Sequence, residues 1–459
     1  MAASALERTA AAALAACAAA ALAGCVSYPA PKPLPTGADI QANPSALKVD
    51  TTTLRLQPLK PVVVDAKDGL DPMEVAVLAV LNSPDLAAKR AALGVNAAQV
   101  FSTGLLPDPQ IAVGADHPFA GPDNQNAFSI SPSLDLTALI TRSAVRNAAR
   151  FTARQADLDV LWAEWGVAQQ ARALAQTALS GEARAIYLQQ VLTAAADRYA
   201  RSSQALANRD VTLQTTAADL AVKVDAQTQL ATAQHDAAKA RRDLNALLNL
   251  DAAVRLPLVD GGDTGAYDEG QIRQSLAGLA DRRPDLLALR AGYSAQDQNI
   301  RRAALARFPL TQIAAAFARD TAGVVTGGVS AAFALPIFNG GKGEERIQLA
   351  TREQLHAEYQ ARLDLTAAEV ADAAAELRTA RAAAAALAID VPRLEALVRP
   401  AVAAYARGDI DSQTYLTLSQ NALARRADLD DRRLAAQLAE IRLETALFLP
   451  PANARTSVR

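Results

Sequence analysis

The chain has 459 residues and a formal net charge of −2 at pH 7, which argues against nucleic-acid binding because that function normally needs a basic patch or stripe. Aromatic residues make up only 4% of the chain, whereas alanine, the best helix former, is abundant throughout. The composition therefore predicts long, closely packed helices rather than a thick globular core.

Residues that could carry catalysis or bind a metal are sparse. The cysteines Cys17 and Cys25 both lie near the start, so the body can hold neither a disulfide framework nor a cysteine-based metal site. The three histidines are isolated from one another, and residues 340–343 (Gly-Gly-Lys-Gly) lack the Ser or Thr that follows the lysine of a phosphate-binding loop. We expect a protein that is not an enzyme and that binds no metal or dissociable cofactor.

The first 24 residues are typical of an export signal. Arg8 supplies a positive charge, and residues 9–22 form an almost unbroken run of alanine and leucine. The run leads into Leu22-Ala23-Gly24-Cys25, which resembles the bacterial lipobox, where cleavage precedes a cysteine that receives a diacylglycerol and a third acyl chain. Two or more acyl chains anchor a protein stably. We therefore expect a covalent lipid on Cys25; the alternative is a plain secretory signal with a chance cysteine.

The residues after Cys25 suggest the destination of the mature chain. Val26 stands where an aspartate would retain a Gram-negative lipoprotein at the inner membrane, so the resemblance implies export to the outer membrane. Residues 29–35 are rich in proline, which predicts a stiff, extended spacer. No later segment offers about 18 consecutive apolar residues, so we expect no transmembrane helix in the mature chain.

The body of the chain repeats itself. Asn82-Ser83-Pro84-Asp85-Leu86 returns as Arg282-Arg283-Pro284-Asp285-Leu286, a spacing of 284 − 84 = 200 residues. Each copy continues into an alanine-rich helix that ends near a proline, Pro107 or Pro309. The long, nearly constant spacing indicates a duplication rather than a short-period solenoid.

Two short alternating stretches follow each of these prolines. In the first copy, Phe128, Ile130, Leu134 and Leu136 share one face, and Ile111, Val113 and Ala115 alternate more weakly before them. The second copy repeats the pattern at Ile313, Ala315 and Phe317, and then at Val329, Ala331, Phe333, Leu335 and Ile337. A period of two over about 9–11 residues is typical of a membrane-spanning β-strand with one face in lipid. Pro132 cannot donate to a ladder, so its strand should be bent or irregular there. The hairpin tips are expected at Pro118–Asn126 and Thr321–Gly328.

Four strands cannot close a barrel, and an open edge cannot persist in lipid because its backbone groups would lack partners. The hairpins are therefore either water-exposed β-hairpins outside any membrane or parts of a barrel shared between copies. Very long helices favour the second interpretation: one runs from Thr141 to about Leu206, on the order of 95 Å at about 1.5 Å per residue. A matching run extends from Gly343 to Ala406 with a possible kink at Pro392, and the antiparallel returns are Asp210–Leu250 and Asp411–Leu449.

The order and duplication of these motifs resemble the TolC, or outer-membrane efflux protein, family over about residues 70–449. The motifs that carry the resemblance are Asn82-Ser83-Pro84-Asp85-Leu86, Leu106-Pro107-Asp108-Pro109, Arg283-Pro284-Asp285-Leu286, Phe308-Pro309, Leu335-Pro336-Ile337-Phe338-Asn339-Gly340-Gly341 and Tyr405-Ala406-Arg407-Gly408-Asp409. The resemblance implies a mainly α fold with a transmembrane β part. Long antiparallel helices would form a periplasmic α-barrel, and four strands per protomer would build a 12-stranded trimeric β-barrel.

This interpretation divides the chain into consecutive segments. The expected segments are the signal peptide (1–24), the lipid anchor, spacer and N-terminal equatorial segment (25–71), a helix (72–106), β-hairpin 1 (107–138), long helical hairpin 1 (139–250), an equatorial linker (251–282), a second helix (283–308), β-hairpin 2 (309–338), long helical hairpin 2 (339–449) and a tail (450–459).

The resemblance implies an exit duct of a tripartite efflux system in the outer membrane of a Gram-negative bacterium, lipid-anchored and extending into the periplasm. The partners would be two further copies of the chain, the membrane lipid, a periplasmic adaptor and an inner-membrane pump, often of the resistance-nodulation-division type. The alternative is a periplasmic helical structural lipoprotein without a pore. An adaptor is disfavoured because no lipoyl-like β domain is found between helical hairpins.

The resemblance also implies a constriction near the helical tips. Residues 405–409 resemble the family's turn between its last two long helices, and a first-copy turn is expected at Tyr199–Ser203 with a longer lead to Asp210. Threefold symmetry would gather Asp409 and Asp411 into six carboxylates that favour cations, with the alternative that they lie on a solvated turn. The full set of candidate tip residues is Tyr199, Asp210, Tyr405, Arg407, Gly408, Asp409, Asp411, Thr414 and Thr417, the two threonines standing where the family often carries acidic residues.

Overall fold

The computed structural model describes residues 30–450 except 61, 63, 65–67, 123, 124, 262–266 and 336, and leaves the side chain of Ser412 undescribed. The chain forms two compact units, Met1–Ile40 and Gln41–Arg459. In the first unit, residues 30–40 are exposed and contain neither helix nor strand. Cys25, the predicted signal peptide and residues 451–459 lie outside the described residues.

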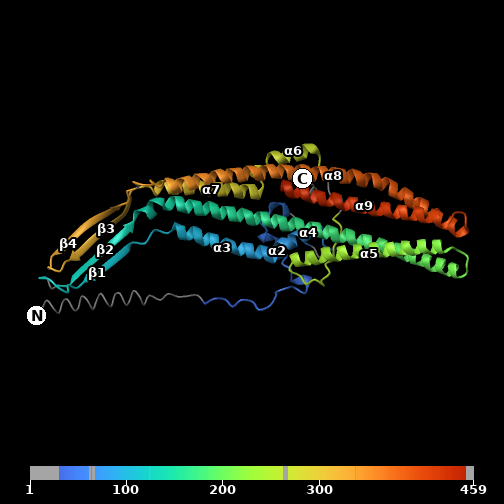
Figure 1. The fold of residues 1–459 in the computed structure, drawn as a ribbon, viewed down its shortest axis with the longest axis horizontal. Helices are drawn as coiled ribbons and strands as arrows, with labels where there is room; N and C mark the ends of the chain where they lie inside the picture. The colour runs from blue at the N-terminus through green and yellow to red at the C-terminus, as the bar shows by residue number, and fades with distance from the viewer. Residues whose placement is uncertain are drawn as a thin grey trace. The chain divides into compact units, whose positions relative to one another are not determined.

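The second unit is dominated by long helices and carries one antiparallel sheet (Figure 1). The helices are α2 (Pro72–Asn82), α3 (Pro84–Gly104), α4 (Leu136–Ala207), α5 (Leu213–Leu247), α6 (Glu269–Ala277), α7 (Pro284–Leu305), α8 (Lys342–Arg407) and α9 (Ser412–Leu447). Short 3-10 helices occupy Pro44–Ala46, Thr51–Thr53, Gln57–Leu59 and Leu279–Asp281. The two longest helices, α4 and α8, have 72 and 66 residues.

Prolines and glycines account for several helix boundaries. Two helices, α2 and α3, occupy the range expected as one helix at 72–106, because Pro84 starts a new helix after the N-cap Ser83. Gly408, at φ 80°, ends α8 in the left-handed conformation that glycine adopts without strain. The kink expected at Pro392 does not end the helix: α8 runs through both Pro392 and Pro400.

The four strands form a meander in the order β1-β2-β3-β4. They span Gln110–Asp116, Ala127–Asp135, Leu310–Arg319 and Val325–Phe333, and every neighbouring pair is antiparallel. The β3–β4 turn is shorter than expected because Gly327 and Gly328 still pair through their backbones with Phe317 and Ala316. Leu335 and Ile337 lie beyond the end of β4 rather than in it.

Pro132 interrupts the pairing of β2 with β3, as expected for a residue without an N–H. Pairing stops after Ile130–Phe317 and resumes at Ser133–Ala314 in the same register. The hydroxyl of Ser131 donates to the carbonyl of Ala315, 3.1 Å away, and Ala315 is the residue opposite Pro132 in that register. The side chain thus satisfies a carbonyl that Pro132 cannot reach.

The register divides the sheet into two chemically different faces. Cross-strand partners project to the same side, so Val113, Ile130 and Phe317 line one face together. This face is apolar and uncovered within the chain; Val329, for example, is 90% exposed. The opposite face carries the serines of β2 opposite alanines and glycines, as in the pair Gly114–Ser129. The alternation expected from the sequence is confirmed.

The long helices pack side by side in the same order as the strands. Beside the sheet the order is α3, α4, α7, α8, and toward the helical turns it is α5, α4, α9, α8 (Figure 1). Each row follows from the packed pairs α3–α4, α4–α7, α7–α8, α4–α5, α4–α9 and α8–α9. The unit is therefore a single wall whose two edges are formed by α3, β1 and α5 on one side and by β4 and α8 on the other.

The segments expected to form an equatorial belt pack against the middle of this wall. Leu54, Leu56 and Leu59 of the N-terminal segment bury themselves with α2 and Trp165 of α4. Tyr267 and α6 pack against α8 and α9. A capping box at Asp71 and Glu74 fixes the start of α2, where Asp71 accepts from the N–H groups of Met73 and Glu74. Over the described residues, no helix is long and apolar enough to cross a membrane.

Candidate functional site

The turn between α8 and α9 brings several of the predicted residues together. The N–H of Gly408 donates to the carbonyl of Tyr405 at 3.0 Å, and Arg407 Nε lies 2.8 Å from Asp409 Oδ2. Asp411 is the N-cap of α9, where it accepts from Thr414 N at 2.7 Å. That backbone hydrogen bond lowers the pKa of the Asp411 carboxyl. Both aspartates are exposed at the turn, and each already has a local partner.

The remaining predicted tip residues are spread around this turn. Thr414 and Thr417 are exposed on the first turns of α9, and the Thr417 hydroxyl donates to Gln413 O at 2.9 Å. Tyr199 lies beneath Lys223, whose Nζ is 5.2 Å from the ring centroid. Asp210 belongs to the α4–α5 turn, where its N–H donates to Ala205 O at 2.8 Å.

The expected position of the first-copy turn is wrong. Residues 199–203 lie inside α4, which continues to Ala207 because no proline or glycine lies in this last part of the helix. The turn follows at residues 208–212, and Arg209 adopts the left-handed conformation at φ 67° that Gly408 provides in the second copy. A non-glycine residue in that region costs roughly 1–2 kcal/mol.

A buried cluster links the two helical hairpins just above these turns. Arg198 of α4 is 8% exposed and its Nε lies 2.8 Å from Oδ1 of Asp219 on α5, which is 1% exposed. The same guanidinium lies 5.1 Å from the ring centroid of Tyr405 and 4.7 Å from that of Tyr415. The two rings stack, with centroids 5.4 Å apart and an interplanar angle of 14°. We call Arg198, Asp219, Tyr405 and Tyr415 the tip cluster.

Only one member of the tip cluster, Tyr405, was expected from the sequence. Arg198 precedes Tyr199 by one residue yet points to the other hairpin, and Asp219 is one of many aspartates on helical faces. The four residues of the tip cluster come from α4, α5, α8 and α9, so their contact depends on how four helices align. No local sequence motif predicts it. Arg407, Gly408, Asp409 and Asp411 lie on the adjoining turn, whereas Asp210 and Tyr199 take part in other contacts.

The second-copy motif Arg283-Pro284-Asp285-Leu286 lies at a junction in the middle of the wall. Here α9 ends and α7 begins, and Arg283 Nη1 donates to Ala446 O at 2.9 Å, near the carboxyl end of α9. Arg283 is 1% exposed, pairs with Asp285 at 2.8 Å and lies over the Trp162 ring at 4.4 Å from its centroid. Arg362 of α8 also pairs with Asp285, at 2.8 Å.

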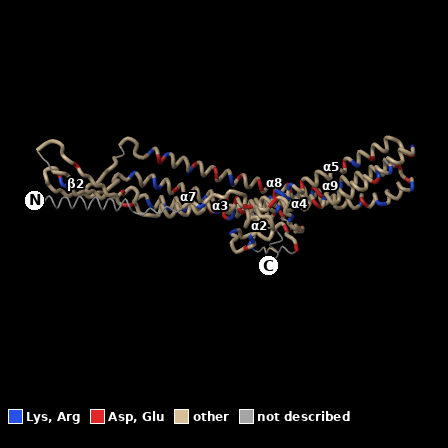
Figure 2. Tube along the Cα trace, turned by 90° about the horizontal axis from the view of Figure 1, so that it is seen from below, with Lys and Arg blue, Asp and Glu red and all other residues tan. Residues whose placement is uncertain are grey.

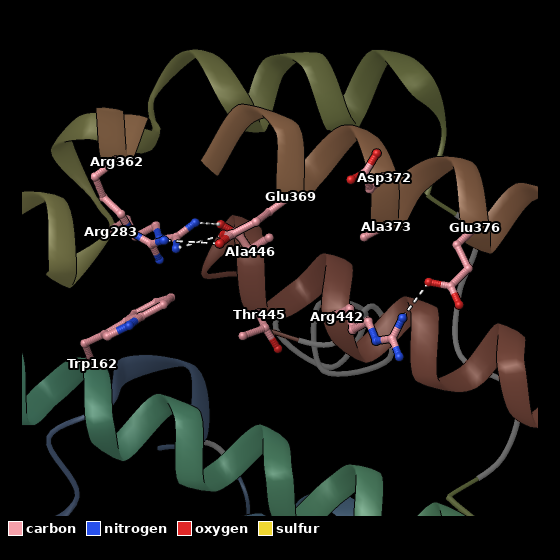
Figure 3. A pocket seen from close by; sticks show the side chains of 10 residues that line it. All are labelled: Trp162, Arg283, Arg362, Glu369, Asp372, Ala373, Glu376, Arg442, Thr445 and Ala446. Atoms are coloured by element: carbon pink, nitrogen blue, oxygen red, sulfur yellow. Dashed lines mark hydrogen bonds and ion pairs between the residues drawn. The ribbon is translucent and has the colours of Figure 1, made fainter. Parts of the chain in front are cut away.

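A cavity of about 440 Å³ lies beside this junction (Figure 3). Trp162 forms one wall, the paired Arg283, Arg362 and Glu369 stand at one end, and the Arg442–Glu376 pair at 2.6 Å stands at the other (Figure 3). The arginines that line the cavity are each held by a carboxylate, so the arrangement ties α4, α7, α8 and α9 together.

A second buried ion pair joins the hairpins nearby. Arg172 of α4 and Glu444 of α9 approach to 2.6 Å with side chains 4% and 0% exposed, and the Tyr267 hydroxyl donates to the other oxygen of Glu444 at 2.8 Å. Trp165 Nε1 donates to Thr445 O at 3.2 Å. Breaking such a buried pair on one side costs roughly 3–5 kcal/mol, so these contacts fix the two hairpins to each other at this level. Among the described residues, no group of His, Cys, Asp and Glu side chains could hold a metal ion.

Neither a protein-family model nor a curated protein matches the sequence. Solved structures do match the fold. The outer membrane channel CmeC of Campylobacter jejuni is 15% identical with a TM-score of 0.70, over 94% of this chain and 97% of CmeC. The outer membrane protein VceC of Vibrio cholerae is 19% identical with a TM-score of 0.68, over 82% of this chain and 95% of VceC. The open-state outer membrane channel MtrE of Neisseria gonorrhoeae is 14% identical with a TM-score of 0.67, over 92% of this chain and 97% of MtrE.

The chain has the fold of these outer-membrane channels. The mainly helical protomer with a four-stranded antiparallel sheet, expected from the resemblance to the TolC family, is thereby confirmed. The match extends over nearly the full length of each channel protein.

Proposed function

We propose that the chain is one protomer of a trimeric outer-membrane channel, the exit duct of a tripartite efflux system. It conducts solutes passively after a periplasmic adaptor and an inner-membrane pump, of the resistance-nodulation-division type, have handed them over. The pump supplies the energy and this chain supplies the passage.

The open wall carries this proposal. Strands β1 and β4 are edges of the sheet, and α3 and α8 continue these edges along the helices. Apolar side chains remain bare on both helical edges: Phe101 of α3 is 71% exposed and Ile347 of α8 is 59% exposed. Joining the α8 edge of one copy to the α3 edge of the next closes a ring, and three copies give a barrel of twelve strands. Closure pairs every strand edge, as a structure in lipid requires.

The uncovered face of the sheet supports a membrane position. It is apolar from Ile111 on the first strand to Val329 on the fourth, and the strands have 7 to 10 residues. Phenylalanines flank the apolar band, with Phe128 and Phe317 toward the hairpin loops and Phe333 toward the helices. Aromatic residues of this kind border the lipid-facing band of outer-membrane barrels. The long helices then extend into the periplasm, and a lipid on Cys25 adds an anchor.

Channel recordings on the purified protein test the proposal. Reconstituted into a planar lipid bilayer, the protein should conduct in discrete steps, and native mass measurement in detergent should give three copies. Val329→Lys places a charge on the lipid-facing side and should lower the yield of inserted trimers, because a charge there costs roughly 2–4 kcal/mol at mid-membrane. A protein that stays monomeric and never conducts would instead be the pore-free helical lipoprotein.

A further inference from the structure

The face of the sheet opposite the apolar band carries no charged side chain between its two ends. Its charged residues are Asp116, at the loop end, and Asp135, at the helix end; Arg319 projects from the apolar face, opposite Phe128. The positions between these ends are Ala112, Gly114, Ser129, Ser131, Ser133, Gln312, Ala314, Ala316, Ala318, Thr326, Gly328, Ser330 and Ala332. Figure 2 shows the contrast with the helices, which carry both signs of charge along their length.

The polar groups on this face are largely occupied by local contacts. The hydroxyls of Ser131 and Thr326 donate to carbonyls of the neighbouring strand at 3.1 and 3.3 Å, and Gln312 donates to the Ser133 hydroxyl at 3.0 Å. Asp135 accepts from Ala138 N at 3.0 Å as the N-cap of α4. Between Asp116 and Asp135 the wall therefore offers a passing solute neither a charge nor a set of convergent polar groups.

Side-chain size matters at this barrel size. Side chains fill a barrel of about eight strands, whereas barrels of about 16–18 strands leave an aqueous channel. Twelve strands lie between these limits, so the residues that point inward decide whether the lumen is open. Alanine, glycine and serine keep it open, and they place no charge in its middle.

From these observations, and resting on the proposed function, we infer that the strand section of the duct, between its end residues Asp116 and Asp135, passes anionic and cationic solutes alike. The residues that set this property are the small, uncharged ones midway along the strands, such as Ser131, Ala316 and Ser330. Charge selection then belongs to the helical section, where the carboxylates of the tip turn lie. Rings of charged side chains are what give other channels their ion selectivity, and between Asp116 and Asp135 this section has none.

The test changes the charge at Ser330 and measures the cation-to-anion permeability ratio in planar bilayers under a salt gradient. Ser330→Lys should shift the ratio severalfold toward anions, Ser330→Asp should shift it toward cations by a similar factor, and Ser330→Asn should leave it unchanged. The wild type should lie midway between the two charged variants on a logarithmic scale. If the lysine variant fails to insert, Ser330→Cys modified after insertion with cationic or anionic methanethiosulfonate reagents repeats the comparison. Val329→Cys, whose side chain faces the other way, should not react with the water-soluble reagents.

The outcomes separate this inference from the proposed function. A wild-type protein that never conducts overturns the channel itself. A protein that conducts, but whose permeability ratio ignores the charge at Ser330, overturns the inference alone. So does a wild type whose ratio matches that of one charged variant, because its strand section would then already carry an effective charge.

Discussion

The short motif Leu22-Ala23-Gly24-Cys25 is the basis on which we propose a lipid anchor at Cys25. We predict that mass spectrometry of the mature N-terminus will find an acylated Cys25 as the first residue. Cys25→Ser should abolish the modification and leave trimer formation in detergent unchanged, because the barrel edges and not the lipid drive assembly. An unmodified terminus at another residue would remove the anchor while leaving the channel intact.

The tip turn carries the second residue-scale prediction. Asp409 and Asp411 contribute two carboxylates per copy, and the hydrogen bond from Thr414 N keeps Asp411 ionised to lower pH than usual. Replacing both with Asn should reduce the cation preference of the channel with trimer yield unchanged, since Asn also serves as an N-cap. An unchanged preference would mean that Arg407 already neutralises the turn, or that the side chains face away from the axis.

The third residue-scale prediction concerns the tip cluster and how firmly it joins the two helical hairpins. Arg198 remains paired with Asp219 if the two rings are removed, so Tyr405→Leu with Tyr415→Leu loosens the link between hairpins without stranding a buried charge. A cation over an aromatic ring contributes roughly 1–2 kcal/mol when desolvated. Losing both rings should therefore raise the population in which the two hairpin turns have moved apart by about tenfold or more. Spin-label distances between the α4–α5 and α8–α9 turns report this change. Tyr199→Leu is the matched control, because Tyr199 contacts Lys223 within its own hairpin.

At the scale of elements, α8 differs from α4 in having prolines inside it. Pro392 and Pro400 each remove a hydrogen bond to the preceding turn of a helix, at a cost of about 3 kcal/mol. We predict that Pro392→Ala with Pro400→Ala slows amide hydrogen exchange in the last turns of α8. The double variant should also make separation of the two hairpin turns rarer. Pro284→Ala, at the first turn of α7 where proline is well tolerated, should change neither. Equal exchange in both variants would show that the prolines do not soften α8.

The elements themselves were predictable because their signals are local. Alternation over Phe128, Ile130 and Leu134 predicts a strand whatever lies beside it, and uninterrupted alanine-rich runs predict the long helices. Helix boundaries that depend on only one or two residues were harder to predict. Pro84 divides a range that was expected to be one helix. Arg209 takes the left-handed turn conformation in which glycine is the usual residue.

Contacts between elements were the part that the sequence could not provide. The Arg172–Glu444 pair joins residues 272 positions apart, and its partners are ordinary charged residues on amphipathic helices until the packing is known. The motif around Arg283 was recognised as a repeat, but its physical role as the joint between α9 and α7 follows only from the structure.

At the scale of the whole molecule, one feature organises the rest: a wall of strands and helices that is open at both edges. The bare apolar face of the sheet and the exposed Phe101 and Ile347 on the helical edges are the surfaces that the proposed ring of several copies would use. A single copy leaves two strand edges unpaired, which lipid does not tolerate.

An image of the detergent-purified full-length protein tests this claim most directly. Averaged projections along the long helices should show threefold symmetry around an open centre, with the strand section of three copies closed into one ring. Particles of a single copy, or particles whose four strands pair only among themselves with no central opening, would contradict the account.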